Sequence, residues 1–176
     1  MLVCGEDLGM IPESVPDVMN KLQILSLEIE RMPKTPQREF SDLFSLPYNS
    51  VCTTSTHDMS PLRNWWKEDR EKIQRYYNNV LHYEGQAPGE CSSDIASRII
   101  TNHLATNSML TIIPLQDWFA IDDTVKRKDI EAERINVPAN SNHYWCYRMH
   151  IPLESLLMKE EFNDKVAQLI VASGRK

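Results

Sequence analysis

The sequence predicts an α/β fold with a parallel sheet, and three observations carry this prediction. Segments with strand-like and helix-like apolar spacing alternate along the 176 residues, the order expected when helices connect parallel strands. About four segments have strand character. Hydrophobic residues make up 41% and charged residues 25%, an ordinary mixture for a globular domain with a core. A complete (β/α)8 barrel typically needs about 250 residues, so we expect half a barrel or a small open sheet.

The first third of the chain supplies three strand candidates and one helix. Residues 1–4 are short and apolar, as in a truncated strand, and residues 12–22 have the apolar stripe of a helix. Residues 24–31 alternate between apolar and polar side chains, which predicts a strand. Residues 33–49 are rich in Pro, Ser and charge and read as a loop, and 50–54 form the next short strand candidate.

Helices dominate the middle of the chain. Ser60 suits a helix cap and Pro61 suits a first helical position, so a helix is predicted from there to about Glu84. Four of its large aromatic residues, Trp65, Trp66, Tyr76 and Tyr77, follow at helical spacing and are expected in the core. Ser92 or Ser93 is expected to cap the next helix.

The last third contains one more strand candidate and a terminal helix. Residues 109–114 form an apolar run bounded by polar residues, which suits a buried strand. Residues 122–143 are mostly loop, and 152–173 are predicted as one amphipathic C-terminal helix. We treat residues 1–176 as one partial domain.

Composition excludes several classes of partner. The formal charge is −6 and no basic stripe occurs, which argues against a nucleic-acid partner. No apolar run reaches the roughly 18 residues of a membrane span, and the N-terminus lacks the pattern of a signal peptide. The four cysteines are widely spaced, so we expect reduced thiols in a cytoplasmic protein without a metal or other cofactor.

Two strand-to-loop transitions carry carboxylates, at Glu6 and at Asp58. Residues at the carboxyl ends of parallel strands face the active site in α/β folds. Glycosidic chemistry requires one acid that protonates the leaving oxygen and another carboxylate beside an oxocarbenium-like transition state. An acidic residue after a strand is also a common cap or turn residue. Asp7, beside Glu6, could instead orient its loop by accepting backbone N–H groups.

Two further clusters suit carbohydrate binding. Gln116, Asp117 and Trp118 follow the last strand candidate and combine polar groups for hydroxyls with an aromatic face, although a capped loop with a packed Trp would look the same. The aromatic density of residues 143–148 indicates either a binding platform or core beneath a long loop.

Together these clusters resemble a known family. Four motifs occur in the order and approximate spacing of the amylomaltases, which are the 4-α-glucanotransferases of glycoside hydrolase family 77. The motifs are Gly5-Glu6-Asp7-Leu8-Gly9, Thr56-His57-Asp58, Pro114-Leu115-Gln116-Asp117 and Glu133-Arg134-Ile135-Asn136-x-Pro138. Leu62-Arg63-Asn64-Trp65-Trp66 and His143-Tyr144-Trp145-Cys146-Tyr147-Arg148 also resemble the subgroup of the plant cytosolic disproportionating enzyme. The resemblance runs from about residue 1 to residue 158.

The resemblance implies a specific fold and site. The chain would be the C-terminal half of a (β/α)8 barrel, with about strands 5–8 and their helices. Glu6 would be the general acid/base and Asp58 the second catalytic carboxylate, which stabilises the transition state. His57, Asn136, Gln116 and Asp117 would bind substrate. The substrates would be α-1,4-glucans, maltose and glucose, and no metal is needed.

The resemblance also implies an incomplete site. The family transfers glucan segments to a 4-hydroxyl by double displacement with retention, and its nucleophile is an aspartate in an Arg-x-Asp context after strand four. We find no counterpart of that aspartate here. We therefore expect this chain alone to be inactive, and its uncovered edges to favour self-association.

Two other classes of function stay open on the sequence. One is a non-catalytic α-glucan-binding fragment, with Trp118 and Trp145 as the contacts. The other is a structural α/β domain whose acidic residues are caps.

Overall fold

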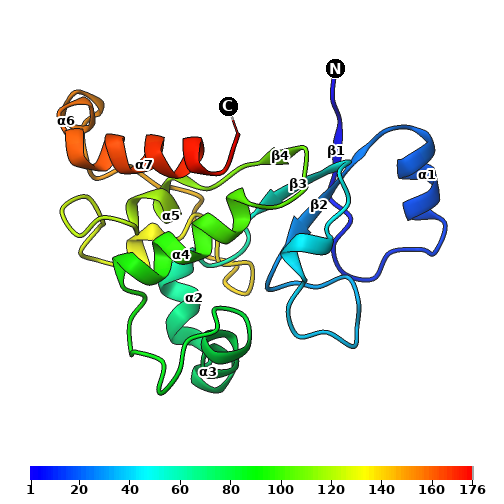
Figure 1. Ribbon diagram of the computed structural model, residues 1–176, viewed down its shortest axis with the longest axis horizontal. Coiled ribbons are helices and arrows are strands. Elements are labelled where there is room, and N and C mark those ends of the chain that lie inside the picture. The colour runs from blue at the N-terminus through cyan, green and yellow to red at the C-terminus, as the bar shows by residue number, and fades with distance from the viewer. Residues whose placement is uncertain (176) are drawn as a thin grey trace.

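The computed structural model describes residues 1–175 and contains a four-stranded sheet, shown in Figure 1. The strand order β1-β2-β3-β4 follows the order of the chain, and each neighbouring pair is parallel. Each connection must therefore cross from one end of the sheet to the other. The strands are β1 (Cys4–Gly5), β2 (Leu25–Ile29), β3 (Ser50–Thr53) and β4 (Leu110–Thr111).

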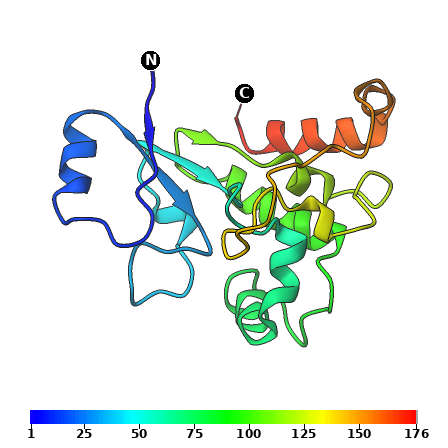
Figure 2. The same ribbon diagram turned by 180° about the vertical axis from the view of Figure 1, so that it is seen from behind.

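The helices are distributed unevenly around this sheet. Figures 1 and 2 show α1 beyond the sheet on one side, whereas the helices from α2 onward gather on the other. The helices are α1 (Val15–Lys21), α2 (Leu62–Glu68), α3 (Arg70–Asn79), α4 (Ser93–Leu104), α5 (Leu115–Phe119), α6 (Leu153–Leu157) and α7 (Glu160–Ala172). Two short 3-10 turns, η1 (Leu43–Ser45) and η2 (Glu131–Glu133), lie in the loops.

The main hydrophobic core lies among the helices. Trp66, Tyr76 and Ile99 are fully buried there and come from α2, α3 and α4. Phe119 of α5 and Phe162 of α7 meet in the same core with ring centroids 5.7 Å apart. The predicted burial of Trp65, Trp66 and Tyr76 is therefore confirmed, and Tyr77 packs at the margin of this core.

Strand register gives the sheet two unlike faces. Leu27 pairs with Val51 and Val51 with Leu110, so apolar side chains share one face. On the other face Ser26 pairs with Ser50, and Cys52 packs against the η1 region in a small separate cluster. The sheet thus has one apolar face and one more polar face.

The central strands were predicted well and the last strand was not. β2 and β3 fall inside the predicted ranges 24–31 and 50–54. The apolar run at 109–114 was predicted as a buried strand, but β4 has two residues, and Leu110 and Ile112 are 38% and 58% exposed. The reason is its position: β4 is an edge strand, so only one neighbour covers it.

The predicted helix from Ser60 to Glu84 is two helices. Asp69 has an extended backbone between α2 and α3, and its carboxylate accepts the N–H groups of Glu71 and Lys72. Ser60 is not the cap of α2. The cap position is Pro61, without a side-chain hydrogen bond of its own, and the Leu62 N–H is satisfied by a distant residue described below.

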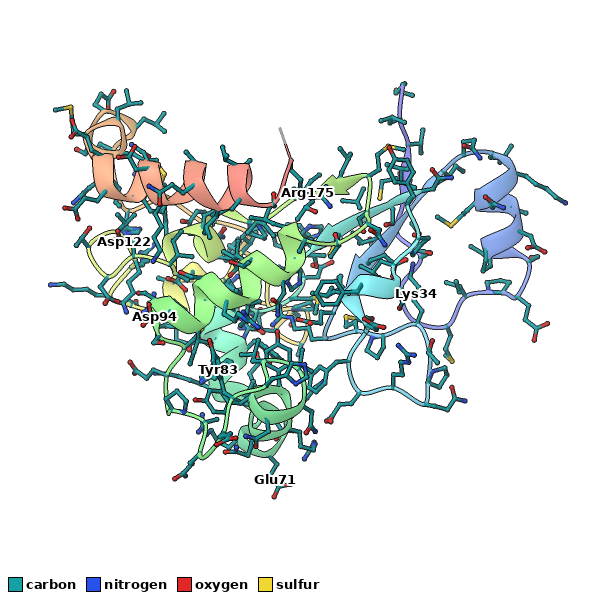
Figure 3. All side chains as sticks on the ribbon, in the orientation of Figure 1. Lys34, Glu71, Tyr83, Asp94, Asp122 and Arg175 are labelled. Atoms are coloured by element: carbon teal, nitrogen blue, oxygen red, sulfur yellow. The ribbon has the colours of Figure 1, made fainter. Side chains whose placement is uncertain are left out.

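The C-terminal segment also differs from the prediction. Residues 152–173 were expected as one helix, but Met158 and Lys159 separate α6 from α7. Ser92 caps α4 by accepting the Ile95 N–H, as predicted. Arg175, labelled in Figure 3, ends the described chain by donating to the carbonyls of Leu104 and Ser108 at 2.7 and 2.9 Å.

The four cysteines are free thiols in two different environments. Cys4 and Cys146 are exposed, whereas Cys52 and Cys91 are buried, and burial raises the pKa of each buried thiol to about 12. Within residues 1–175, no helix has the length and apolar character to span a bilayer. Nor does that part of the chain place three or more His, Cys, Asp or Glu side chains where they could hold a metal ion.

Candidate active site

The predicted site residues lie where the parallel strands end. Glu6 is the residue after β1, and its side chain is exposed. His57 and Asp58 lie in the loop between β3 and α2, and Gln116 and Asp117 lie in the first turn of α5, shortly after β4. Since the carboxyl ends of parallel strands share one edge of the sheet, these segments belong to the same side of the molecule.

Asp58 is held by the two residues predicted to act with it. Nε2 of His57 lies 3.2 Å from Oδ2 of Asp58. Nδ2 of Asn136 donates to Oδ1 of the same carboxylate at 2.5 Å, and the Asn136 N–H donates to the His57 carbonyl at 3.1 Å. His57, Asp58 and Asn136 therefore form one cluster, although Asp58 and Asn136 are 78 residues apart in sequence.

This cluster is open to solvent on one side. The side chains of His57 and Asp58 are 49% and 43% exposed, whereas Asn136 is 8% exposed beneath them. A carboxylate oriented by a buried amide and left accessible can accept hydrogen bonds from a sugar hydroxyl or face a developing positive charge.

An exposed tryptophan borders the cluster. The ring centroids of His57 and Trp145 are 4.9 Å apart at an interplanar angle of 41°, and Trp145 is 60% exposed. Trp118, the other aromatic candidate, packs instead against the hydrophobic core. The structure thus favours a platform role for Trp145 and a packing role for Trp118.

Asp7 orients the loop that follows β1. It is 6% exposed, accepts the Leu27 N–H at 2.9 Å, and pairs with Lys34 at 2.7 Å. Lys34, labelled in Figure 3, also pairs with Glu28 of β2 at 2.8 Å. The loop carrying Glu6 is therefore tied to β2 by its neighbour, as the orienting alternative for Asp7 predicted.

Asp117, which was predicted as a substrate ligand, is buried in this structure. Asp117 is 1% exposed, and both of its carboxylate oxygens accept hydrogen bonds from protein groups. Oδ2 accepts from the hydroxyls of Thr54 and Ser55, and Oδ1 accepts the Leu62 N–H. Burial raises the pKa of the Asp117 carboxyl, and these hydrogen bonds oppose the rise. A carboxylate satisfied in this way supports the site from beneath.

Gln116 is likewise a buried support. It is 4% exposed, and its Nε2 donates to the Glu133 carbonyl at 3.2 Å. The Glu133 side chain forms a buried ion pair with Arg63 of α2. Burial raises the pKa of Glu133 to about 7, although Arg63 opposes the rise. Gln116 and Asp117, which were predicted to bind substrate, make their side-chain hydrogen bonds within the protein in this structure.

Two cavities flank these residues. A cavity of about 180 Å³ lies at the carboxyl end of β3, lined among others by His57, Gln116 and Ile135. A larger one of about 470 Å³ lies between α1 and β2, with Asp7, Met19 and Lys34 in its lining. The smaller cavity adjoins the Asp58 cluster and the larger one adjoins the loop that carries Glu6.

Sequence reasoning missed the residues that hold the site in place. No role was predicted for Thr54, Ser55, Arg63 or Glu133. Thr54 and Ser55 donate hydrogen bonds to Asp117, and Arg63 pairs with Glu133 in the segment before Asn136. Arg63 and Glu133 lie inside the motifs quoted above. Charged residues within such motifs were the one available signal.

The geometry of these residues indicates a class of protein, and the comparisons with known proteins then identify the family. An accessible carboxylate oriented by His and Asn, beside an aromatic ring and on the side of the sheet that carries an exposed Glu, offers the groups that carbohydrate chemistry requires. The chain belongs to glycoside hydrolase family 77, whose family model, described as 4-alpha-glucanotransferase, matches residues 1–154.

Curated relatives and solved structures agree with this assignment. The chain is 40% identical over 175 residues to 4-alpha-glucanotransferase DPE2 of Oryza sativa subsp. japonica, covering 99% of this chain and 18% of that protein. It is 29% identical over 185 residues to 4-alpha-glucanotransferase of Chlamydia caviae, covering 96% of this chain and 32% of the relative. It thus spans a fifth to a third of their lengths.

The fold is that of amylomaltase structures. The amylomaltase from Streptococcus agalactiae in complex with acarbose superposes with a TM-score of 0.73 at 19% identity, covering 98% of this chain and 32% of that one. The amylomaltase from Corynebacterium glutamicum gives 0.74 at 19% identity, covering 96% and 28%. At this identity the two structures establish the α/β fold with its parallel sheet.

Proposed function

We propose that this chain carries the acid/base part of a 4-α-glucanotransferase active site. In this proposal Glu6 is the general acid/base, Asp58 stabilises the transition state, and His57 and Asn136 bind sugar hydroxyls. The observation that carries the proposal is the His57–Asp58–Asn136 cluster, in a chain of family 77. We further propose that β1 to β4 are strands 5–8 of a (β/α)8 barrel.

The chemistry assigned to Glu6 requires an accessible carboxyl group. Protonated Glu6 gives its proton to the leaving glycosidic oxygen, and ionised Glu6 then takes the proton of an incoming 4-hydroxyl. The exposed position of Glu6 directly after β1 suits both steps. The donors are α-1,4-glucans and the acceptors glucose or maltose; the acarbose bound to the Streptococcus amylomaltase supports a glucan-like ligand.

Asp58 is not placed as the nucleophile. A retaining enzyme keeps its two reacting carboxyl groups about 5 Å apart. β1 and β3 are separated by β2, so Glu6 and Asp58 start from strands about 10 Å apart. We assign the nucleophile to another carboxylate, and we expect the 176-residue chain on its own not to disproportionate maltotriose.

A chimera tests the function directly. In the rice relative, the segment matched by this chain would be replaced with residues 1–175. We expect the chimera to release glucose from maltotriose, and Glu6→Gln to lower kcat by about 10²–10⁴, the usual contribution of general acid–base catalysis. Asp17→Asn, an exposed carboxylate on α1, is the matched control. A Glu6→Gln chimera as active as its parent would exclude the assigned role.

Glucan binding without catalysis is the second candidate, and the position of Trp145 favours it. The exposed indole beside His57 suits stacking on a glucose ring. We expect Trp145→Ala to weaken maltoheptaose binding by the 176-residue chain about threefold to tenfold, since one aromatic contact contributes about 1 kcal/mol. Isothermal titration would measure it.

Tyr48→Ala is the control for that titration. Tyr48 is 65% exposed and precedes β3, at the opposite end of the strand from His57. Equal affinities for Trp145→Ala and the unsubstituted chain would remove Trp145 from the site, and no binding by either would restrict the proposal to the complete active site.

A further inference from the structure

The Asp117 carboxylate makes all its hydrogen bonds to one loop. Oδ2 accepts from Thr54 Oγ1 at 2.5 Å and from Ser55 Oγ at 3.0 Å. Oδ1 accepts the Leu62 N–H at 2.8 Å. A buried carboxylate is stable only when its oxygens are satisfied, and here every partner comes from the segment between β3 and α2.

These hydrogen bonds fix both ends of the loop that carries Asp58. Thr54 and Ser55 directly follow β3, and Leu62 is the first residue of α2. The residues between them, 56–61, include His57 and Asp58. Fixing two ends to one side chain shortens the free loop and restricts the conformations open to it.

Helix capping alone does not explain this arrangement. Capping α2 needs only the bond from the Leu62 N–H to Oδ1. The Thr54 and Ser55 hydroxyls bind the other oxygen and lie outside the helix. The second oxygen therefore serves the start of the loop and has no part in the cap.

Gln116, the residue before Asp117, binds the segment that carries Asn136, the other residue that supports Asp58. Gln116 donates to the Glu133 carbonyl, three residues before Asn136. Asn136 in turn binds the His57 carbonyl and the Asp58 carboxylate. Two consecutive residues of α5 thus hold the two segments that meet at Asp58.

We propose that Asp117 and Gln116 are positioning residues that fix the orientation of the Asp58 carboxylate through these two segments. The proposal concerns first the positions of His57, Asp58 and Asn136 in the structure. Its consequence for catalysis rests on the proposed function. Asp117 never touches substrate in this scheme; it holds the loop so that Asp58 needs no rearrangement when substrate arrives.

The test compares Asp117→Ala with Asp69→Ala in the 176-residue chain. Both substitutions remove a carboxylate that accepts backbone N–H groups at a helix start, but only Asp117 also binds the hydroxyls of the catalytic loop. NMR would follow the imidazole ¹⁵N resonances of His57 at fixed pH and the amide exchange of residues 56–59. These signals report the loop directly and need no glucan.

Asp117→Ala should move the His57 resonances and speed exchange at residues 56–59 about tenfold, as expected when buried hydrogen bonds that close a local segment are lost. Asp69→Ala should leave both unchanged. Asp117→Asn keeps a carbonyl oxygen for the Leu62 N–H and should restore part of the protection. Unchanged His57 signals in folded Asp117→Ala protein would overturn the proposal.

Gln116→Ala keeps the test decisive if Asp117→Ala does not fold. It removes one neutral hydrogen bond to the Glu133 carbonyl and should move the Asn136 side-chain amide and His57 resonances while leaving the Leu62 amide in place. If Asp117→Asn and Gln116→Ala both leave His57 unmoved, the positioning role is wrong. The maltotriose assay of the chimera is separate, so its failure would reject the function and leave these results standing.

Discussion

Glu30 is an acidic residue that the fold buries. It follows β2, is 5% exposed, and accepts a hydrogen bond from the hydroxyl of Tyr76 at 2.6 Å. Burial raises the pKa of Glu30 to about 7, although the Tyr76 hydrogen bond and Arg31 oppose the rise. Arg31, the next residue, is directed to the Ser60 carbonyl and the Trp65 ring.

This raised pKa makes stability depend on pH. The folded state holds the Glu30 proton more tightly than the unfolded chain, where the pKa is near 4.5. Its contribution is therefore fully present below about pH 4.5 and is lost as the pH rises through about 7. Between pH 5 and 8.5 we expect a loss of up to about 3 kcal/mol from this residue.

Glu30→Gln should reduce that loss, because an amide does not ionise. Urea unfolding at pH 5 and pH 8.5 would measure the free energy of unfolding of both proteins. Glu154→Gln, on the exposed surface of α6, is the control and should follow the unsubstituted chain. Glu133 contributes with the same sign, so some pH dependence should persist in Glu30→Gln. Equal slopes for all three proteins would contradict the assignment.

At the scale of single elements, α3 owes its start to Asp69. The Asp69 carboxylate accepts two backbone N–H groups at 3.0 Å each, and its extended backbone ends α2 at Glu68. A helix start without such a cap leaves these donors unsatisfied. The break also lets α2 and α3 place Trp65 and Tyr76 in contact, with ring centroids 4.9 Å apart.

Asp69→Ala should destabilise the protein by about 1 kcal/mol, the usual contribution of an N-cap side chain. Asp69→Ser keeps an acceptor and should recover most of the loss. The free energy of urea unfolding would measure both. Glu71→Ala, an exposed residue in the same turn, is the comparison that separates capping from general surface charge. A loss for Glu71→Ala equal to that for Asp69→Ala would argue against the cap.

The sequence predicts elements whose pattern is local and fails where contacts are remote. Alternation located β2, and β3 falls within the short strand candidate at 50–54, because the patterns of both central strands are local. The apolar stripe through Trp65 and Tyr76 continues across Asp69, so the break between α2 and α3 was invisible to periodicity. β4 resembled a buried strand because no local pattern shows that a strand lies at a sheet edge.

The same distinction applies to the site. The order of the motifs predicted that Glu6, Asp58, His57 and Asn136 belong to one site. In the structure Asp58, His57 and Asn136 are in contact. The burial of Asp117 depends on partners 55 to 63 residues away in sequence, which no local rule supplies. A polar residue in a motif can therefore mark a support of the site as readily as a ligand.

At the scale of the whole molecule, the sheet has two open edges. Within residues 1–175, β1 pairs only with β2, and β4 only with β3. Apolar side chains flank both edges: Leu2 and Val3 are 63% and 45% exposed, and Ile112 is 58% exposed. Open edges with apolar side chains promote pairing with another chain.

We therefore predict concentration-dependent self-association of the 176-residue chain. Ile112→Lys and Leu2→Lys each place a charge at one edge, and charges at sheet edges oppose edge-to-edge pairing. Light scattering over a concentration series should show a lower mean mass for these variants. Leu157→Lys on α6, 77% exposed and outside the sheet, should leave it unchanged. A monomer at all concentrations would contradict the prediction.

The four thiols differ in burial, so the exposed pair can be labelled selectively in the native sequence. Thiolates are the reactive form, so Cys52 and Cys91, which are buried and have pKa values of about 12, should resist maleimide at neutral pH. Cys4 and Cys146 remain for labelling. One precedes Glu6 by two residues and the other adjoins Trp145. A donor and an acceptor fluorophore on these two positions would report, without any added cysteine, how the two sides of the candidate site move relative to each other.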